Sequence, residues 1–157
     1  MKIFIPIKEN SQRVPRKNFR IFNGLPLYKH TLCKLKSFDI FVDTDSKKIY
    51  DEINQDPELA HVTVFIREKK LTGDEVSVCK LIENFIRKFN IKNETLCQIH
   101  VTSPFLTLDT LERALQKVGD YDSVVSCNPL QTRLWRQEKY GMCPVNNNPT
   151  VLQQTQD

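Results

Sequence analysis

Apolar and polar positions alternate along the chain in two recurring patterns as far as Ser126. Short apolar or β-branched blocks predict buried strands, whereas blocks with apolar residues three and four positions apart predict amphipathic helices. The predicted strands are residues 2–7, 40–42, 61–66, 96–101 and 123–126. The predicted helices are residues 26–36, the segment KKIYDEINQD, and residues 74–89 and 107–118. Strands that alternate with helices predict an α/β fold, with an open, mostly parallel sheet and helices on both faces.

Turn residues mark where the first helices begin. The Asn23-Gly24 pair predicts a turn before the first helix. The turn Asp43-Thr44-Asp45-Ser46 can cap the second helix, because short oxygen side chains accept from the free amide donors of a helix start. After Asn128 the sequence becomes polar, VNNNPTVLQQTQD, with no closing helix or strand. We expect residues 1–157 to form a single α/β domain that lacks a C-terminal portion.

Composition supports one globular domain. The chain has 157 residues, of which 39% are hydrophobic and 27% charged, and this balance argues against disorder. The net charge of +4 is below that of a typical nucleic-acid coat protein, so we expect no nucleic-acid partner. No apolar run approaches the roughly 20 residues that span a bilayer, and no signal peptide is visible. The expected protein is soluble and cytoplasmic, with no membrane partner.

Five cysteines are scattered without a CxxC spacing. An odd number cannot pair completely within one chain, which favours reduced thiols with structural roles. His30, His61 and Trp135 are likewise interpreted as structural residues.

A basic loop follows the first predicted strand, in the stretch IPIKENSQRVPRKNFR. Ligands of open parallel sheets bind beyond the carboxyl ends of the strands, which is where this loop lies. Arg and Lys bind phosphate oxygens, so a nucleoside triphosphate is the natural candidate and the domain would be nucleotide-binding. Neither GxxxxGK[ST] nor GxGxxG is present, which removes the best evidence for a P-loop or an ordinary dinucleotide fold. A solvated cationic turn is the alternative.

The stretch IPIKENSQRVPRKNFRIFNGLPLYKHTL resembles the N-terminal motif of the CMP-N-acylneuraminate cytidylyltransferases, the CMP-sialic acid synthetases. VDTDS, LTGDEVS, HVTSPFL and TQD resemble later motifs of that family. The resemblance implies a nucleotide-diphospho-sugar transferase-like fold. It also implies CTP and a sialic-acid-like nonulosonic sugar acid as partners, and it allows a homodimer of the full-length protein.

The resemblance assigns roles to particular residues. The implied nucleotide-binding residues are Lys8, Ser11, Arg13, Lys17 and Asn18 at the triphosphate, and Arg67, Asp74 and Ser77 near the base and ribose. The implied substrate-binding residues are His100, Thr102 and Ser103. His100 stands where the family commonly has Gln, and Glu9-Asn10 where it often has two glycines. HVTSPF differs from the QGDEP pattern of the related KDO synthetases, which argues against KDO as the sugar.

The implied reaction is attack of the sugar's anomeric hydroxyl on the α-phosphorus of CTP, with release of pyrophosphate. Arg13 and Lys17 are the expected catalytic residues, because they would stabilise the leaving pyrophosphate. Mg²⁺ is the expected cofactor.

The resemblance places the metal-binding aspartates beyond Asp157, so no metal ligand is assigned in this chain. Asp43 and Asp45 could be considered as ligands, but their spacing also suits a helix cap.

Two alternatives differ in class. One is a non-catalytic nucleotide-binding remnant of such an enzyme. The other is a sugar-1-phosphate nucleotidyltransferase, which the lack of glycine between Lys8 and Arg20 argues against.

Overall fold

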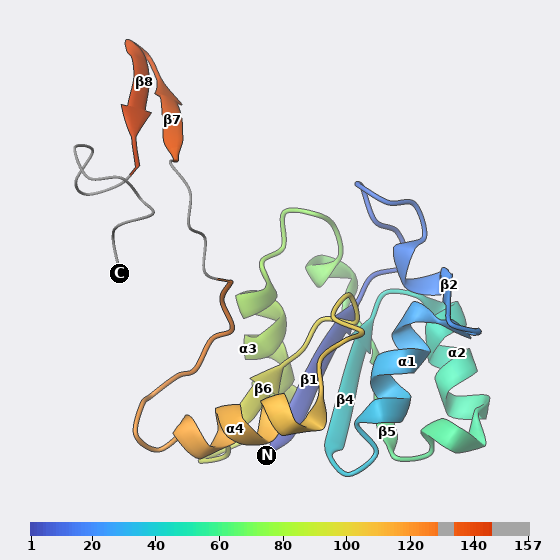
Figure 1. Ribbon diagram of the computed structural model, residues 1–157. Coiled ribbons are helices and arrows are strands. Elements are labelled where there is room, and N and C mark those ends of the chain that lie inside the picture. The colour runs from blue at the N-terminus through green and yellow to red at the C-terminus, as the bar shows by residue number, and fades with distance from the viewer. Residues whose placement is uncertain (129–133, 146–157) are drawn as a thin grey trace. The chain divides into compact units, whose positions relative to one another are not determined.

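A four-stranded parallel sheet forms the centre of the computed structural model, which describes residues 1–128 and 134–145. Its strands are β1 (Lys2–Ile7), β4 (Asp39–Thr44), β5 (Val62–Ile66) and β6 (Leu96–Gln98). They lie in the order β5-β4-β1-β6 (Figure 1). The chain therefore moves outward from β1 to β5 on one side, then crosses to place β6 on the other side of β1.

Alternation along β1 divides the core between the two faces of the sheet. Ile3, Ile5 and Ile7 are fully buried in one cluster, whereas Phe4 belongs to a second cluster with Phe85. Successive side chains of a strand point to opposite faces, so a strand that is apolar at every position must be covered on both. The sequence pattern of β1 thus demands a three-layer arrangement.

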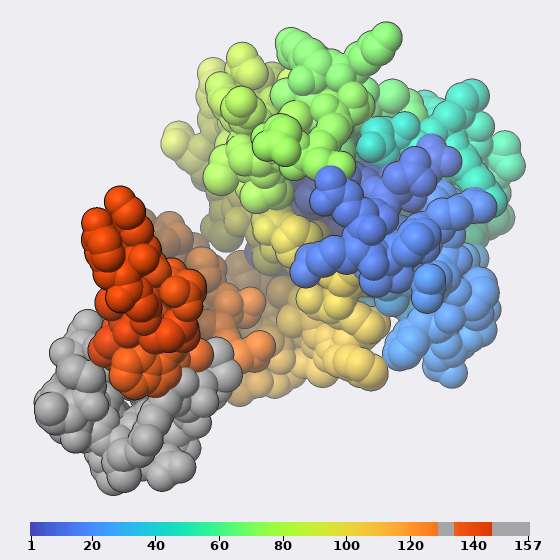
Figure 2. Space-filling view, turned by 90° about the horizontal axis from the view of Figure 1, so that it is seen from above, coloured from blue at the N-terminus to red at the C-terminus, as the bar shows by residue number. Residues whose placement is uncertain are grey.

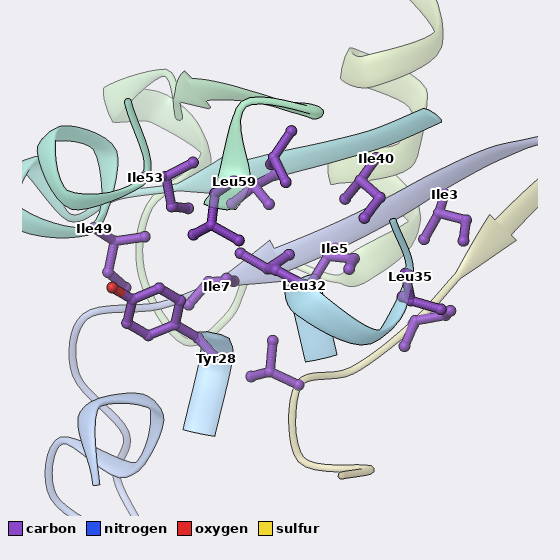
Figure 3. Close-up of a cluster of buried hydrophobic side chains, with 14 of the residues drawn as sticks. Ile3, Ile5, Ile7, Tyr28, Leu32, Leu35, Ile40, Ile49, Ile53 and Leu59 are labelled. Carbon is purple, nitrogen blue, oxygen red and sulfur yellow. The ribbon is translucent and has the colours of Figure 1, made fainter. Parts of the chain in front are cut away.

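Helices supply both outer layers. Helices α1 (Leu27–Lys34), α2 (Lys47–Gln55) and α4 (Leu108–Lys117) contribute to the first cluster, part of which is shown in Figure 3. Helix α3 (Val78–Lys88) covers the other face through Leu81 and Phe85. The Phe85 ring lies 4.9 Å from that of Phe4 and 5.0 Å from that of Phe41. The predicted α/β fold with helices on both faces is confirmed.

The chain divides into two compact units, Met1–Asp122 and Ser123–Asp157. The first contains the sheet, its helices and a short hairpin of β2 (Ile21–Phe22) and β3 (Leu25–Pro26). The described part of the second contains an antiparallel hairpin of β7 (Trp135–Glu138) and β8 (Gly141–Pro144). The assignment of all 157 residues to one domain remains a prediction.

Some predicted boundaries are wrong. The helix predicted from residue 74 begins at Val78, because the Ser77 hydroxyl caps it by accepting from the Lys80 amide at 3.5 Å. The strand predicted over residues 96–101 ends at Gln98, since the chain turns where the Ser103 amide donates to the His100 carbonyl at 3.1 Å.

Other differences concern whole elements. Residues 123–126 form no strand, because β-branched residues adopt strand structure only with a partner. The β7–β8 hairpin was not predicted, because its residues show no apolar alternation. Most of the polar segment VNNNPTVLQQTQD lies outside the described residues.

No helix in the described parts of the chain has the length and apolar character needed to cross a membrane. All five cysteines are unpaired thiols, and burial raises the pKa values of Cys33 and Cys97.

Candidate functional site

A cavity of about 360 Å³ lies beyond the carboxyl ends of β1 and β6. Figure 2 looks onto this end of the sheet, where the blue N-terminal loop, the green segment before α3 and the yellow segment after β6 surround a hollow. Strands β1 and β6 are neighbours at which the chain reverses its direction across the sheet. Such a switch point leaves a crevice between loops that diverge to opposite faces, and open α/β sheets bind their ligands there.

Most of the predicted site residues line this cavity. They are Lys8, Ser11, Arg13, Lys17, Asn18, Arg67, Asp74, His100 and Thr102. Ser77 and Ser103 are not among the lining residues. Ser77 caps α3, and the Ser103 amide closes the turn after β6, so the structure gives each of these two residues a local structural role. The roles in binding predicted for all these residues, Ser77 and Ser103 included, remain predictions.

Hydrogen bonds between side chains and the backbone hold the basic loop after β1. The Asn18 side-chain amide donates to the Lys8 carbonyl at 2.7 Å, and Asn18 is the buried middle residue of the loop's short helix η1 (Lys17–Phe19). The Glu9 amide donates to Asp45 Oδ1, also at 2.7 Å. Arg16 adopts a left-handed conformation with φ of 50°. The loop is thus anchored on both sides of the residues that line the cavity.

Asp74 connects the basic loop to the segment that precedes α3. Lys8 Nζ lies 3.1 Å from Asp74 Oδ1 and donates to the Gly73 carbonyl at 2.7 Å. Gln12 donates to Asp74 Oδ2 at 2.7 Å. These contacts join two walls of the cavity.

Arg13 and Lys17 differ from Lys8 in their partners. Within residues 1–128 and 134–145, neither side chain takes part in an ion pair. Arg13 is exposed and Lys17 is half-buried. Their donors are therefore available to an anion in the cavity.

Arg67 forms a different kind of wall. Its side chain is fully buried, as is that of Asp43, and Arg67 Nε donates to Asp43 Oδ1 at 2.9 Å. Arg67 Nη2 also donates to the Asp43 carbonyl at 3.1 Å. Burial raises the pKa of the Asp43 carboxyl, and the Arg67 guanidinium opposes that shift.

The aspartates after the second predicted strand are not helix caps. Ser46 caps α2 by accepting from the Ile49 amide at 3.3 Å, whereas Asp43 pairs with Arg67 and Asp45 accepts from Glu9. The described residues contain no group of three or more His, Cys, Asp or Glu side chains placed to hold a metal ion. Asp43 and Asp45 each contact another residue of the chain, Arg67 and Glu9 respectively.

The sequence did not identify every lining residue. Gln12 and the apolar residues Pro6, Val76, Val78, Leu81 and Val101 were missed as part of the site. Pro6 carried a usable signal: proline lacks an N–H and is rare inside a sheet. The β1–β6 register covers Lys2 to Phe4 and stops before Pro6, so the cavity begins where the ladder ends.

Comparison with known proteins gives consistent matches. The sequence profile of a family described as cytidylyltransferase matches residues 3–135. CMP-N,N'-diacetyllegionaminic acid synthase of Legionella pneumophila is 31% identical over 138 residues, which cover 82% of this chain and 58% of that protein. Pseudaminic acid cytidylyltransferase of Campylobacter jejuni is 29% identical over 126 residues, which cover 72% of this chain and 50% of that protein.

A solved structure of CMP:2-keto-3-deoxy-manno-octonic acid synthetase complexed with CTP has a TM-score of 0.61 to this chain at 16% identity. The match covers 78% of this chain and 48% of that one. It confirms the predicted nucleotide-diphospho-sugar transferase-like fold. The chain spans about half the length of the curated relatives that it matches.

Proposed function

The chain belongs to the cytidylyltransferase family, and from that premise we propose that its cavity binds CTP. The observation that carries the proposal is the make-up of the cavity. Arg13 and Lys17 present cations without ion-pair partners among the described residues, while Arg67 presents buried donors from another wall. A triphosphate suits the first group, and the acceptor atoms of a base suit the second.

We propose that the full reaction transfers CMP from CTP to a sialic-acid-like nonulosonic acid. The names of the relatives support a sugar acid of this class. The oxygen of the sugar's anomeric hydroxyl forms a bond to the α-phosphorus as its proton leaves to water, and the bond from the α-phosphorus to the pyrophosphate oxygen breaks. Arg13 and Lys17 neutralise the charge that grows on the departing pyrophosphate. His100 and Thr102, which enter the cavity from the segment after β6, orient the sugar acid.

Mg²⁺ is proposed to arrive with the nucleotide. Magnesium in nucleotide sites is commonly bound by phosphate oxygens with one or two carboxylates, and it neutralises part of the phosphate charge. Asp74 is the carboxylate that lines the cavity, and it already contacts Lys8 and Gln12. The steps assigned above to the chain's own residues do not depend on a metal site within it.

We propose a cytoplasmic location. The support is the state of the thiols: all five cysteines are unpaired, as is usual in a reducing compartment.

A nucleotide-binding module without turnover is the second candidate. The observation that favours it is the lack of a carboxylate cluster among residues 1–128 and 134–145. Such a module would bind CTP in the same cavity and release no pyrophosphate.

Titration calorimetry with CTP, UTP and ATP tests nucleotide binding. We expect CTP to bind most tightly, and equal affinity for all three would contradict the proposal. Pyrophosphate release in the presence of Mg²⁺, CTP and a panel of nonulosonic acids then separates the two candidates. Release that depends on a sugar acid supports the transferase, and CTP binding without release supports the module.

A further inference from the structure

Asp43 and Arg67 meet because of the register between β4 and β5. Asp43 lies opposite Phe65, and Arg67 follows two positions later on the same face of the sheet. This face is the one covered by α3, whose residues Val78 and Leu81 line the cavity together with Arg67. The pair is therefore part of the cavity wall, although Asp43 itself does not line the cavity.

The hydrogen-bond donors of Arg67 are only partly used. A guanidinium has five N–H donors, and Asp43 accepts from Nε and Nη2. Arg67 Nη1 is buried and has no partner among the described residues. A buried donor without a partner is costly, so a ligand acceptor in the cavity would satisfy it.

The charge of Arg67 is balanced by the adjacent Asp43 carboxylate. Asp43 Oδ1 lies 2.9 Å from Nε, and both side chains have no exposed surface. The Arg67 wall therefore offers directional donors with little net charge, in contrast to Arg13 and Lys17. A polyanion interacts more favourably with the unpaired cations Arg13 and Lys17 than with the Asp43–Arg67 pair. An uncharged heterocycle has no ionic interaction to give up, so it can accept a hydrogen bond from that pair without an electrostatic penalty.

We infer that Asp43 is a positioning residue: its carboxylate balances the charge of Arg67, so that Arg67 acts as a hydrogen-bond donor to the nucleotide base rather than as a phosphate-binding cation. Asp43 thereby fixes which end of the cavity takes the base and which takes the triphosphate. The inference rests on the proposed binding of CTP and adds a residue that does not touch the ligand.

Asp43→Asn is the test variant, because Asn keeps the size and an acceptor oxygen but removes the charge. Asp39→Asn is the matched control: Asp39 is the exposed first residue of the same strand and lies at its opposite end. Calorimetry measures the affinities of each protein for CTP, UTP and inorganic tripolyphosphate. We expect Asp43→Asn to bind tripolyphosphate about three- to tenfold more tightly than the wild type, because Arg67 regains a net charge. We also expect its preference for CTP over UTP to fall, with Asp39→Asn unchanged in both respects.

Asp43→Glu separates charge from position. It keeps the carboxylate but displaces it by one methylene, so tripolyphosphate affinity should stay at the wild-type value while the CTP preference falls. A cooperative thermal transition identifies the variants that fold.

The outcomes are distinct. If Asp43→Asn folds and has the wild-type affinity for tripolyphosphate and the wild-type preference for CTP over UTP, the inference is overturned. If Asp43→Asn does not fold, an unchanged preference for CTP over UTP in Asp43→Glu overturns it. A wild-type protein that does not prefer CTP over UTP contradicts the proposed function itself.

Discussion

Single residues of the basic loop differ in what they contact, and this decides what they can do. Lys8 contacts Asp74 and the Gly73 carbonyl, which gives it a role in joining two segments. Arg13 and Lys17 line the same cavity without an ion-pair partner in the described ranges. We therefore expect the largest losses of nucleotide affinity from changes at Arg13 and Lys17.

Lys17→Ala should weaken CTP binding by about 1–3 kcal/mol, the usual effect of removing one partner of a charge-assisted hydrogen bond. Titration calorimetry measures the change. Lys92→Ala is the matched control, since Lys92 is exposed and lies in the loop that precedes β6, at the amino ends of the strands. Equal CTP affinities in Lys17→Ala and the wild type would contradict the role of Lys17.

His100→Gln should change the preference among sugar acids more than the affinity for CTP. Gln donates and accepts at once, whereas a neutral His does so only in a fixed tautomer. Calorimetry with N-acylneuraminic, pseudaminic and legionaminic acids gives the ratios of affinity, and we expect at least one ratio to shift by about threefold. The CTP affinity of the same variant is the internal control. Unchanged sugar ratios would remove His100 from the sugar site.

At the scale of elements, α3 decides how the cavity is walled. Its N-terminal residues Val78 and Leu81 line the cavity, and its later residue Phe85 anchors the helix among the aromatic rings of the sheet. Phe85 is fully buried. The packing of Phe85 near the C-terminal end of α3 thus positions Val78 and Leu81, which line the cavity at the N-terminal end.

Phe85→Ala should lower the free energy of unfolding by about 3–5 kcal/mol, because it leaves a cavity among close-packed rings. Ile86→Ala is the control on the same helix. Because Ile86 is 37% exposed, this variant should lower the free energy of unfolding far less. Urea unfolding followed by circular dichroism measures both. Similar losses in the two variants would show that α3 is not anchored through Phe85.

An ion pair connects α1 to the short helix η2 (Pro57–Leu59). Lys29 pairs with Asp56, and this contact lowers the pKa of Asp56. Asp56 also accepts from the Glu58 amide at 3.0 Å, and Asn can keep that cap.

Asp56→Asn should therefore cost less than about 1 kcal/mol at pH 7, as expected for a partly exposed ion pair. Because the folded pKa lies below the unfolded value of about 3.9, the stabilisation is present above that pH and is lost as pH falls through the folded pKa. Thermal melts of the two proteins should differ at pH 7 and converge near pH 2. A difference that persists unchanged in acid would show that the ion pair is not its cause.

At the scale of the whole molecule, the order of the strands in the sheet creates the site. The reversal between β1 and β6 opens the cavity in the unit Met1–Asp122. The chain spans about half of the curated relatives it matches, and its described residues hold no metal-binding cluster. We therefore make separate predictions for nucleotide binding and for turnover.

We predict that the 157-residue chain binds CTP but releases pyrophosphate at least about 100-fold more slowly than the full-length legionaminic acid relative under the same conditions. The loss of one preorganised electrostatic group commonly has an effect of this size. A coupled pyrophosphate assay with Mg²⁺, CTP and a panel of sugar acids measures both rates. Comparable turnover would contradict the prediction, and Asp74 would then be the first carboxylate to replace, because it lines the cavity.

The layers of the fold and the position of the basic loop could be predicted from the amino-acid sequence. Apolar periods of two and of three to four residues report local burial, so β1, β4, β5 and the covering helices could be predicted from them. The loop from Lys8 to Arg20 could be placed at a strand's carboxyl end for the same reason. His100 and Thr102 were added by resemblance to a family, and they line the same cavity.

Tertiary structure alone decided which side chains share that cavity and which neutralise one another. The position of β6 beside β1 depends on a crossover that no local pattern encodes, and it creates the switch point. Asp43 could be interpreted as a cap or a metal ligand from its neighbours in sequence, yet its partner Arg67 is 24 positions away. That contact exists only once β4 and β5 are in register, because register fixes which side chains two strands bring together on one face.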